Sequence, residues 1–177
     1  MNFKPLAAAS ALMAMVYLAS PVPAHADASM QTTDFVRKAS QGNMFEIESS
    51  KIALKKSSAK DVKDFAQAMV TDHTQIGDQF KKTLAASNTG LTPATQLASE
   101  DQKTLDILKA APAPTFDNQY VQAQSKAHDG AVSLFSDYAE NGDNTDLKTF
   151  AADTLPTLKK HQDMVHTLSQ SYMSSSK

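Results

Sequence analysis

Apolar residues recur along most of this chain with the 3.6-residue period of α-helices, in four long segments and one short one. The pattern predicts helices over residues 33–57, 58–88, 92–108, 116–140 and 144–172. The second helix has the strongest apolar face, formed by Val62, Phe65, Ala66, Met69, Ile76, Phe80 and Leu84. The fourth is expected to bury Phe116, Tyr120, Ala123, Ala127, Ala131, Leu134 and Tyr138. Helical periodicity of this extent indicates an all-α protein.

Local signals mark where the helices begin and end. Ser58 is followed three residues later by Asp61, which is typical of an N-cap at the start of the second helix. The stretch ending at Gly90 is expected to stop that helix, and Pro93 to start the short one. Pro156 lies inside the last helix, where it should cause a kink.

One motif occurs twice at a constant spacing. Asp61-Val62-Lys63-x-Phe65-Ala66 matches Asp146-Leu147-Lys148-x-Phe150-Ala151 with an offset of 85 residues, and Phe35-Val36 matches Tyr120-Val121 at the same offset. The offset indicates a duplicated helical hairpin. Two hairpins joined by a long crossover form the ferritin-like four-helix bundle, and the short helix over residues 92–108 would belong to the crossover.

The first 26 residues have the features of a secretory signal peptide. A basic start ends at Lys4, an apolar run follows, and Ala24-His25-Ala26 offers a cleavage site. The apolar run is shorter than the roughly 20 residues of a membrane span. We therefore expect export to the periplasm, with attachment to the outer membrane left open. The folded domain is expected over residues 27–173, followed by a disordered tail over residues 174–177.

Composition narrows the chemistry and the partners. The chain of 177 residues has no Cys and a formal net charge of −2. Disulfides and thiolate metal sites are excluded, and a slightly acidic chain is poorly suited to the phosphates of nucleic acids. No segment after the signal peptide is apolar enough to span a membrane. An envelope protein remains a candidate partner.

Four ionisable residues fall near the inward faces of the predicted helices. Glu46 lies on the apolar stripe of the first predicted helix, and His73 lies in the middle of the apolar face of the second predicted helix. His161 falls within the apolar sector of the last helix and His128 at the edge of the fourth, whereas His166 points away. Counted from the hairpin turns at 1.5 Å per residue, the two residues of each hairpin differ in level by about one helical turn.

Glu46, His73, His128 and His161 could therefore converge on one metal ion in the bundle core. Such ligands suit a single zinc, copper or iron ion. Asp72 and Asp129 are candidates to accept hydrogen bonds from the histidine nitrogens that do not bind the ion. A second interpretation stays open, because a buried histidine is often a hydrogen-bonded core residue. A small rotation of the first helix would also expose Glu46, which otherwise needs a buried partner.

Four motifs occur together in a known family. They are Phe35-Val36-x-x-Ala39-Ser40-x-Gly42-x-Met44-x-Glu46, Val62-Lys63-x-Phe65-Ala66-x-x-Met69-Val70-x-Asp72-His73-Thr74, His128-Asp129, and Leu147-Lys148-x-Phe150-Ala151 with Thr154-Leu155-Pro156-x-Leu158-x-x-His161. With these motifs the chain resembles an exported bacterial domain family of unknown function, whose members are often called predicted outer-membrane proteins. The resemblance implies a ferritin-like bundle and hardly constrains the activity.

The chain lacks the ligand pattern of di-iron ferritin-like proteins. That pattern needs a Glu on each of two helices and a Glu-x-x-His on each of the other two. Here Val70 stands three residues before His73, and Leu158 stands three residues before His161. An oxidase or iron-storage protein would therefore lack its bridging carboxylates.

Two functions remain. The first is a non-enzymatic periplasmic bundle that acts as a binding or envelope-stress protein, with its buried polar residues paired to one another. The second is a metal-binding ferritin-like protein with one mononuclear site. The sequence favours the first function and supplies the residues for testing the second.

Overall fold

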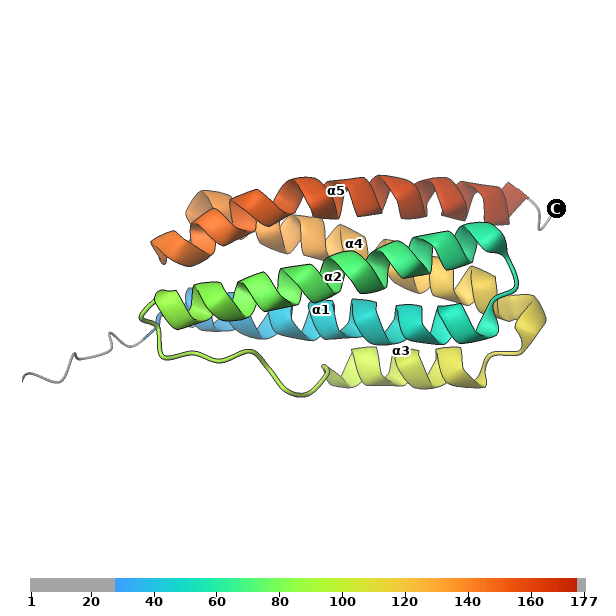
Figure 1. Cartoon of the computed structure of the whole chain (residues 1–177), viewed down its shortest axis with the longest axis horizontal. Helices are drawn as coiled ribbons and strands as arrows, with labels where there is room; N and C mark the ends of the chain where they lie inside the picture. Colours follow the sequence, from blue (N-terminus) through green and yellow to red (C-terminus); the bar gives the residue numbers. More distant parts are fainter. Residues whose placement is uncertain (1–27, 175–177) are drawn as a thin grey trace, which may run out of the picture.

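The computed structural model describes residues 28–174, which form five helices and the loops between them (Figure 1). The helices are α1 (Met30–Lys56), α2 (Lys60–Ala86), α3 (Ser99–Ala110), α4 (Ala113–Asn141) and α5 (Thr145–Ser174). The signal peptide and all but the first residue of the expected tail lie outside the described residues. Within that part of the chain, no helix contains a stretch that is long and apolar enough to cross a bilayer.

Two antiparallel hairpins, α1–α2 and α4–α5, pack together as a four-helix bundle (Figure 1). The connection between them runs back along the bundle, so α4 has the same direction as α2. Helix α1 packs on α4 and α2 on α5, while α3 lies outside against α1 and α4. This arrangement confirms the predicted ferritin-like bundle. The repeat of 85 residues relates α1 to α4 and α2 to α5.

The crossover is less helical than the sequence predicts. Residues 87–98 form no α-helix, and α3 begins only at Ser99, so Pro93 does not start a helix. Asn88 and Gly90 adopt positive φ angles of 54° and 68°, which turn the chain sharply after α2. The crossover must then travel along the bundle. Extended backbone covers roughly 3.3 Å per residue against 1.5 Å in a helix, which accounts for the loss of helix here.

Some helix starts also differ from prediction. Helix α1 begins at Met30 instead of residue 33, because the Ser29 side chain accepts a hydrogen bond from the Thr32 amide at 3.0 Å. Helix α2 is preceded by Ala59 and not by a Ser58 cap. Helix α5 continues through Pro156 as one element, as the helix predicted over residues 144–172 does, and the kink at Pro156 stays a prediction.

The bundle interior contains two apolar clusters, one toward each end. The first contains Phe35, Val36, Ala39, Phe80, Leu84, Phe135, Tyr138, Leu147, Phe150, Ala151 and Leu158. The second contains Ala53, Val62, Phe65, Ala66, Met69, Leu108, Ala111, Phe116, Tyr120, Val121 and Val165. A layer of buried polar side chains separates them; it contains Glu46, Ser49, His73, Gln124, His128 and His161. The layer lies at mid-length on α1, α2, α4 and α5.

Helix α4 is rotated relative to its predicted face. Ala123 and Ala127 are only half-buried, whereas Gln124 and His128 are fully buried. The periodicity of α4 is ambiguous because small alanines sit beside its polar residues. In the structure, Ala123 and Ala127 line a cavity between α1 and α4, and Gln124 and His128 point toward the centre of the bundle.

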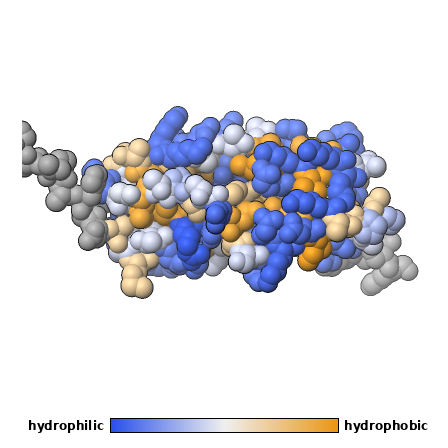
Figure 2. Space-filling view, turned by 90° about the horizontal axis from the view of Figure 1, so that it is seen from below, coloured by the Kyte–Doolittle hydropathy of each residue, from blue (hydrophilic) through white to orange (hydrophobic). Residues whose placement is uncertain are grey.

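The side of the molecule that carries α3 is largely hydrophilic, with apolar surface visible between the polar side chains (Figure 2). On α3, Leu108 is 1% exposed and Ile107 is 59% exposed. Leu108 thus faces the bundle, and its neighbour Ile107 faces solvent. Since Leu108 belongs to the second apolar cluster, α3 is part of the folded core.

This contrast predicts the energetics of α3. Leu108→Ala should lower the free energy of unfolding by about 2–5 kcal/mol, because it removes buried methyl groups and leaves a cavity. Ile107→Ala should change it by less than about 0.5 kcal/mol. Chemical denaturation of both variants measures the difference. Equal effects would show that α3 is not docked as described.

Candidate metal centre

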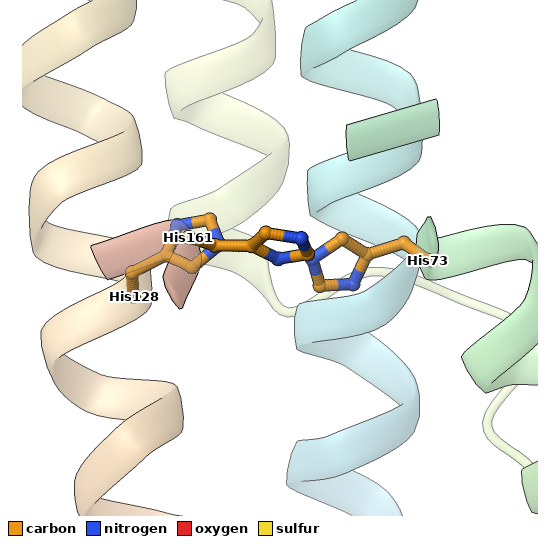
Figure 3. A group of neighbouring side chains, drawn as sticks. All are labelled: His73, His128 and His161. Atoms are coloured by element: carbon orange, nitrogen blue, oxygen red, sulfur yellow. The ribbon is translucent and has the colours of Figure 1, made fainter. Parts of the chain in front are cut away.

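Three histidines meet at the centre of the polar layer. His73 comes from α2, His128 from α4 and His161 from α5, and their side chains point toward one another at one level of the bundle (Figure 3). Their exposed fractions are 3%, 0% and 0%. The ring centroids are 5.7 Å apart for His73 and His128, 5.4 Å for His73 and His161, and 5.5 Å for His128 and His161. The rings therefore form a nearly equilateral triangle.

The outer nitrogen of each ring meets an oxygen atom. His73 Nδ1 donates to Oδ1 of Asn43 at 3.0 Å, and His128 Nδ1 donates to the backbone carbonyl of Gln124 at 3.0 Å. His161 Nε2 donates to Oδ2 of Asp72 at 2.8 Å. A backbone carbonyl, an amide oxygen and a carboxylate can only accept, so these contacts place the ring protons on the outer nitrogens.

The inner nitrogens are therefore left with lone pairs. His73 Nε2, His128 Nε2 and His161 Nδ1 are buried and have no hydrogen-bond partner within residues 28–174. One nitrogen of each ring lies within 4.8 Å of its counterparts in the other two rings. Three lone pairs facing a common point, with each ring held from behind by an acceptor, is the arrangement expected of a histidine metal site.

Burial keeps the three rings neutral. Desolvation lowers the pKa of His73 well below its ordinary value, and the nearby His128 and His161 lower it further. Desolvation also lowers the pKa of His128 to about 4. For His161, desolvation lowers the pKa although its bond to Asp72 opposes the change. Neutral imidazoles are the form that binds metal ions, so the rings need not lose protons near pH 7.

Glu46 lies behind the histidines instead of among them. Its Oε1 is 3.5 Å from the outer nitrogen of His128, and its side chain is 4% exposed. Burial raises the pKa of Glu46 to about 8, although a hydrogen bond with Gln124 acts in the opposite direction. Because the pKa of His128 is lowered, the contact joins two neutral groups and is not an ion pair. The alternative of an exposed Glu46 is therefore excluded, and Glu46 stands outside the nitrogen triangle.

The two aspartates expected behind the rings differ in position. Asp72 accepts from His161, as expected. Asp129 instead lies at the surface, where it accepts from His166 at 3.0 Å and from Gln162 at 2.8 Å. Asp129 follows His128 directly, and adjacent residues on a helix point about 100° apart. The Asp129 carboxylate therefore cannot accept a hydrogen bond from the His128 ring.

Two residues that hold the histidine rings, Asn43 and Gln124, were not predicted from the sequence. Asn43 lies three residues before Glu46 on α1, so the helical period could have placed it on the same face. Gln124 acts on His128 through its backbone carbonyl, for which no residue type gives a signal. Its side chain also donates to Ser49 at 2.9 Å, which links α4 to α1 within the polar layer.

A glycine on α2 leaves room for Asn43. A Cβ added at Gly77 would lie 2.8 Å from Nδ2 of Asn43, closer than normal packing allows. Gly77 is one helical turn beyond His73, the ring that Asn43 holds. The absence of a side chain at this position therefore allows Asn43 to reach His73.

The fold and the site together define a ferritin-like four-helix bundle with a histidine cluster at its centre. The chain matches the family described as "Domain of unknown function (DUF4142)" over residues 18–168. It therefore belongs to that family, which confirms the resemblance to an uncharacterised domain family. No curated protein matches the chain.

Two solved structures share the fold. A DUF305 fragment from Deinococcus radiodurans aligns with a TM-score of 0.68 and 16% identity, covering 82% of this chain and 99% of the fragment. CopM in the Cu(II)-bound form aligns with a TM-score of 0.66 and 17% identity, covering 78% of this chain and 95% of CopM. At these identities the similarity establishes the bundle architecture.

The buried carboxyl of Glu46 predicts how stability depends on pH in metal-free protein. Its pKa is about 8 when folded, above the reference value of 4.5, so its stabilising contribution is complete below pH 4.5 and is lost as the pH rises toward 8. Glu46→Gln removes this dependence. Relative to wild type, the variant should gain about 2–3 kcal/mol in unfolding free energy between pH 5 and pH 7.

Denaturant unfolding in the presence of a chelator at the two pH values measures this gain. Glu48→Gln is the control, because Glu48 is half-exposed and pairs with Lys51 at the surface. Its stability relative to wild type should change by less than about 0.5 kcal/mol over the same range. A flat difference for Glu46→Gln would contradict the buried neutral carboxyl.

Proposed function

We propose that this protein binds a single transition-metal ion through the inner nitrogens of His73, His128 and His161. The observation that carries the proposal is a cluster of three buried histidines: one nitrogen of each ring lies within 4.8 Å of the others, and the inner nitrogen of each ring has no partner within residues 28–174. A hydrogen-bonded core would pair such atoms with donors, because a buried acceptor without a partner costs about 1–3 kcal/mol. A shared cation satisfies all three at once, which favours the metal-binding function over a bundle stabilised by internal polar pairs.

Copper is the ion that we favour, and zinc is the alternative. Imidazole ligands suit both ions, and the affinity of nitrogen sites for divalent ions is greatest for copper. One of the solved structures that are similar in fold is CopM in the Cu(II)-bound form. The cluster has no thiolate, because the chain has no Cys. Three neutral imidazoles with Asp72 behind one of them form a compact site for a single ion.

We also propose that the protein works outside the cytoplasm. The support is the basic and apolar start of the chain before Ala24-His25-Ala26. Fractionation of expressing cells and N-terminal sequencing of the product test this. The proposal requires a product that begins after Ala26 in the periplasmic or outer-membrane fraction. A product that keeps residues 1–26 in the cytoplasm would contradict it.

Metal binding should stabilise the folded protein. At a free-ion concentration of about 100 times Kd, mass action adds about 2.7 kcal/mol to the free energy of unfolding. For a domain of this size, that corresponds to a rise in Tm of about 5–10 °C. Equilibrium dialysis against copper(II) or zinc(II) should give one ion per chain. Thermal unfolding under the same conditions should give the rise in Tm.

Two histidines on α5 give a matched pair of variants. His161→Ala should abolish both the bound ion and the rise in Tm, since it removes one of three ligands. His166→Ala should keep both, because His166 is exposed and contacts Asp129. If neither ion stabilises wild-type protein, or if the two variants behave alike, the proposed function is wrong.

The second pair of variants tests the hydrogen bond between His73 and Asn43. Gly77→Ala should weaken metal binding about tenfold, because the new methyl group displaces Asn43 from His73. Gly130→Ala is the control, since a Cβ there has no described atom within 4 Å. Both substitutions raise helix propensity by similar amounts, so stability alone does not separate them. Isothermal titration gives the two affinities, and equal values would exclude this role of Asn43.

A further inference from the structure

A cavity of about 860 Å³ lies at the seam between α1 and α4, beside α3. Small side chains such as Ala39, Ala127 and Ala131 line it, and its inner wall includes Glu46 and His73. Both of these residues are 3% exposed, and each has a buried polar atom without a partner within residues 28–174. The cavity therefore extends inward as far as the polar layer of the bundle.

Part of the cavity lies on one side of the histidine triangle. Its wall includes Ile76, Ala131 and Leu158. Each of these residues is three positions from one of the histidines, toward the end of the bundle that holds the first apolar cluster. One helical turn thus separates this part of the cavity from the level of the rings.

The opposite side of the triangle is closed. Phe65, Met69 and Val165 are buried there in the second apolar cluster, with exposed fractions of 2%, 0% and 0%. The Phe65 ring packs edge-on against His128 with a centroid distance of 6.2 Å. An ion held by the three nitrogens would therefore be closed in by packed side chains on one side, and on the other it would face the cavity, whose wall includes His73.

We propose that this open position takes a small anionic ligand, which enters through the cavity. The inference rests on the proposed metal site and concerns its fourth ligand. Three neutral imidazoles leave the charge of a divalent ion uncompensated, and Asp72 behind His161 offsets only part of it. A monodentate anion at the fourth position supplies the missing charge. Zinc and copper sites with an open position bind water or exogenous ligands in this way.

Glu46 is the competing internal ligand, because its carboxyl lines the same cavity. If it moved onto the ion, no position would remain for an outside anion. Glu46→Gln keeps the shape of the side chain and removes the carboxyl that could lose its proton and bind the ion, so it distinguishes the two arrangements.

The experiment uses copper(II)-loaded protein and azide as the probe. Titration of wild type should give a saturable azide-to-copper charge-transfer absorption with one azide per copper, and a changed electron paramagnetic resonance spectrum. Metal analysis after the titration should still give one copper per chain. Glu46→Gln should bind azide with an affinity within about threefold of wild type.

Filling the cavity should block the probe. Ala131→Leu places three extra carbons one turn from His128, and Gly130→Leu extends from a position with no described atom within 4 Å of its Cβ. At least one of these variants should keep one copper per chain and bind azide about tenfold more weakly. Ala152→Leu, at an exposed position on α5, should match wild type.

The outcomes separate the two proposals. If copper binds through the histidines but azide binds to neither wild type nor Glu46→Gln, the open position is wrong and the metal site stands. If azide binds only to Glu46→Gln, Glu46 is the fourth ligand and the inference is overturned. If both leucine variants retain copper and wild-type azide affinity, the cavity is not the route. If copper does not bind at all, the inference fails together with the proposed function.

Discussion

Three imidazole nitrogens facing one another in the middle of an apolar bundle are the constraint on which the rest of the structure depends. One ring nitrogen of each of His73, His128 and His161 lies within 4.8 Å of the others, and the inner nitrogens lack partners in the described part of the chain. Such an arrangement loses hydration without gaining hydrogen bonds, which is costly in a protein interior. The surrounding packing must hold it together.

That packing comes from both ends of the bundle. Apolar clusters above and below the polar layer join all four long helices, so the helices cannot separate at the centre without opening one cluster. The outer nitrogen of each ring is held by Asn43, the Gln124 carbonyl or Asp72. These acceptors come from α1, α4 and α2, so orienting the three rings depends on more than one hairpin. The site is thus built by the bundle and not by a local motif.

Much of the fold could be predicted because helical periodicity is a local property. The long helices, the duplicated hairpin and the bundle follow from spacing that any short window of the sequence shows. The crossover was harder, since Pro93 carries a helix-start signal but stands in a segment that must span the bundle. The distance between helix ends decides its conformation, and that distance is a tertiary quantity.

The candidate site shows where the sequence by itself was sufficient and where it was not. Periodicity determined that Glu46, His73 and His161 face inward, and composition restricted any metal site to imidazole and carboxylate ligands. Only the tertiary structure placed His128 at the centre and Glu46 behind it. Helix rotation is set by packing against two neighbours, and a rotation of a few tens of degrees leaves the sequence pattern unchanged while it redirects a ring. The direction of each lone pair depends on acceptors from distant segments, which no local pattern specifies.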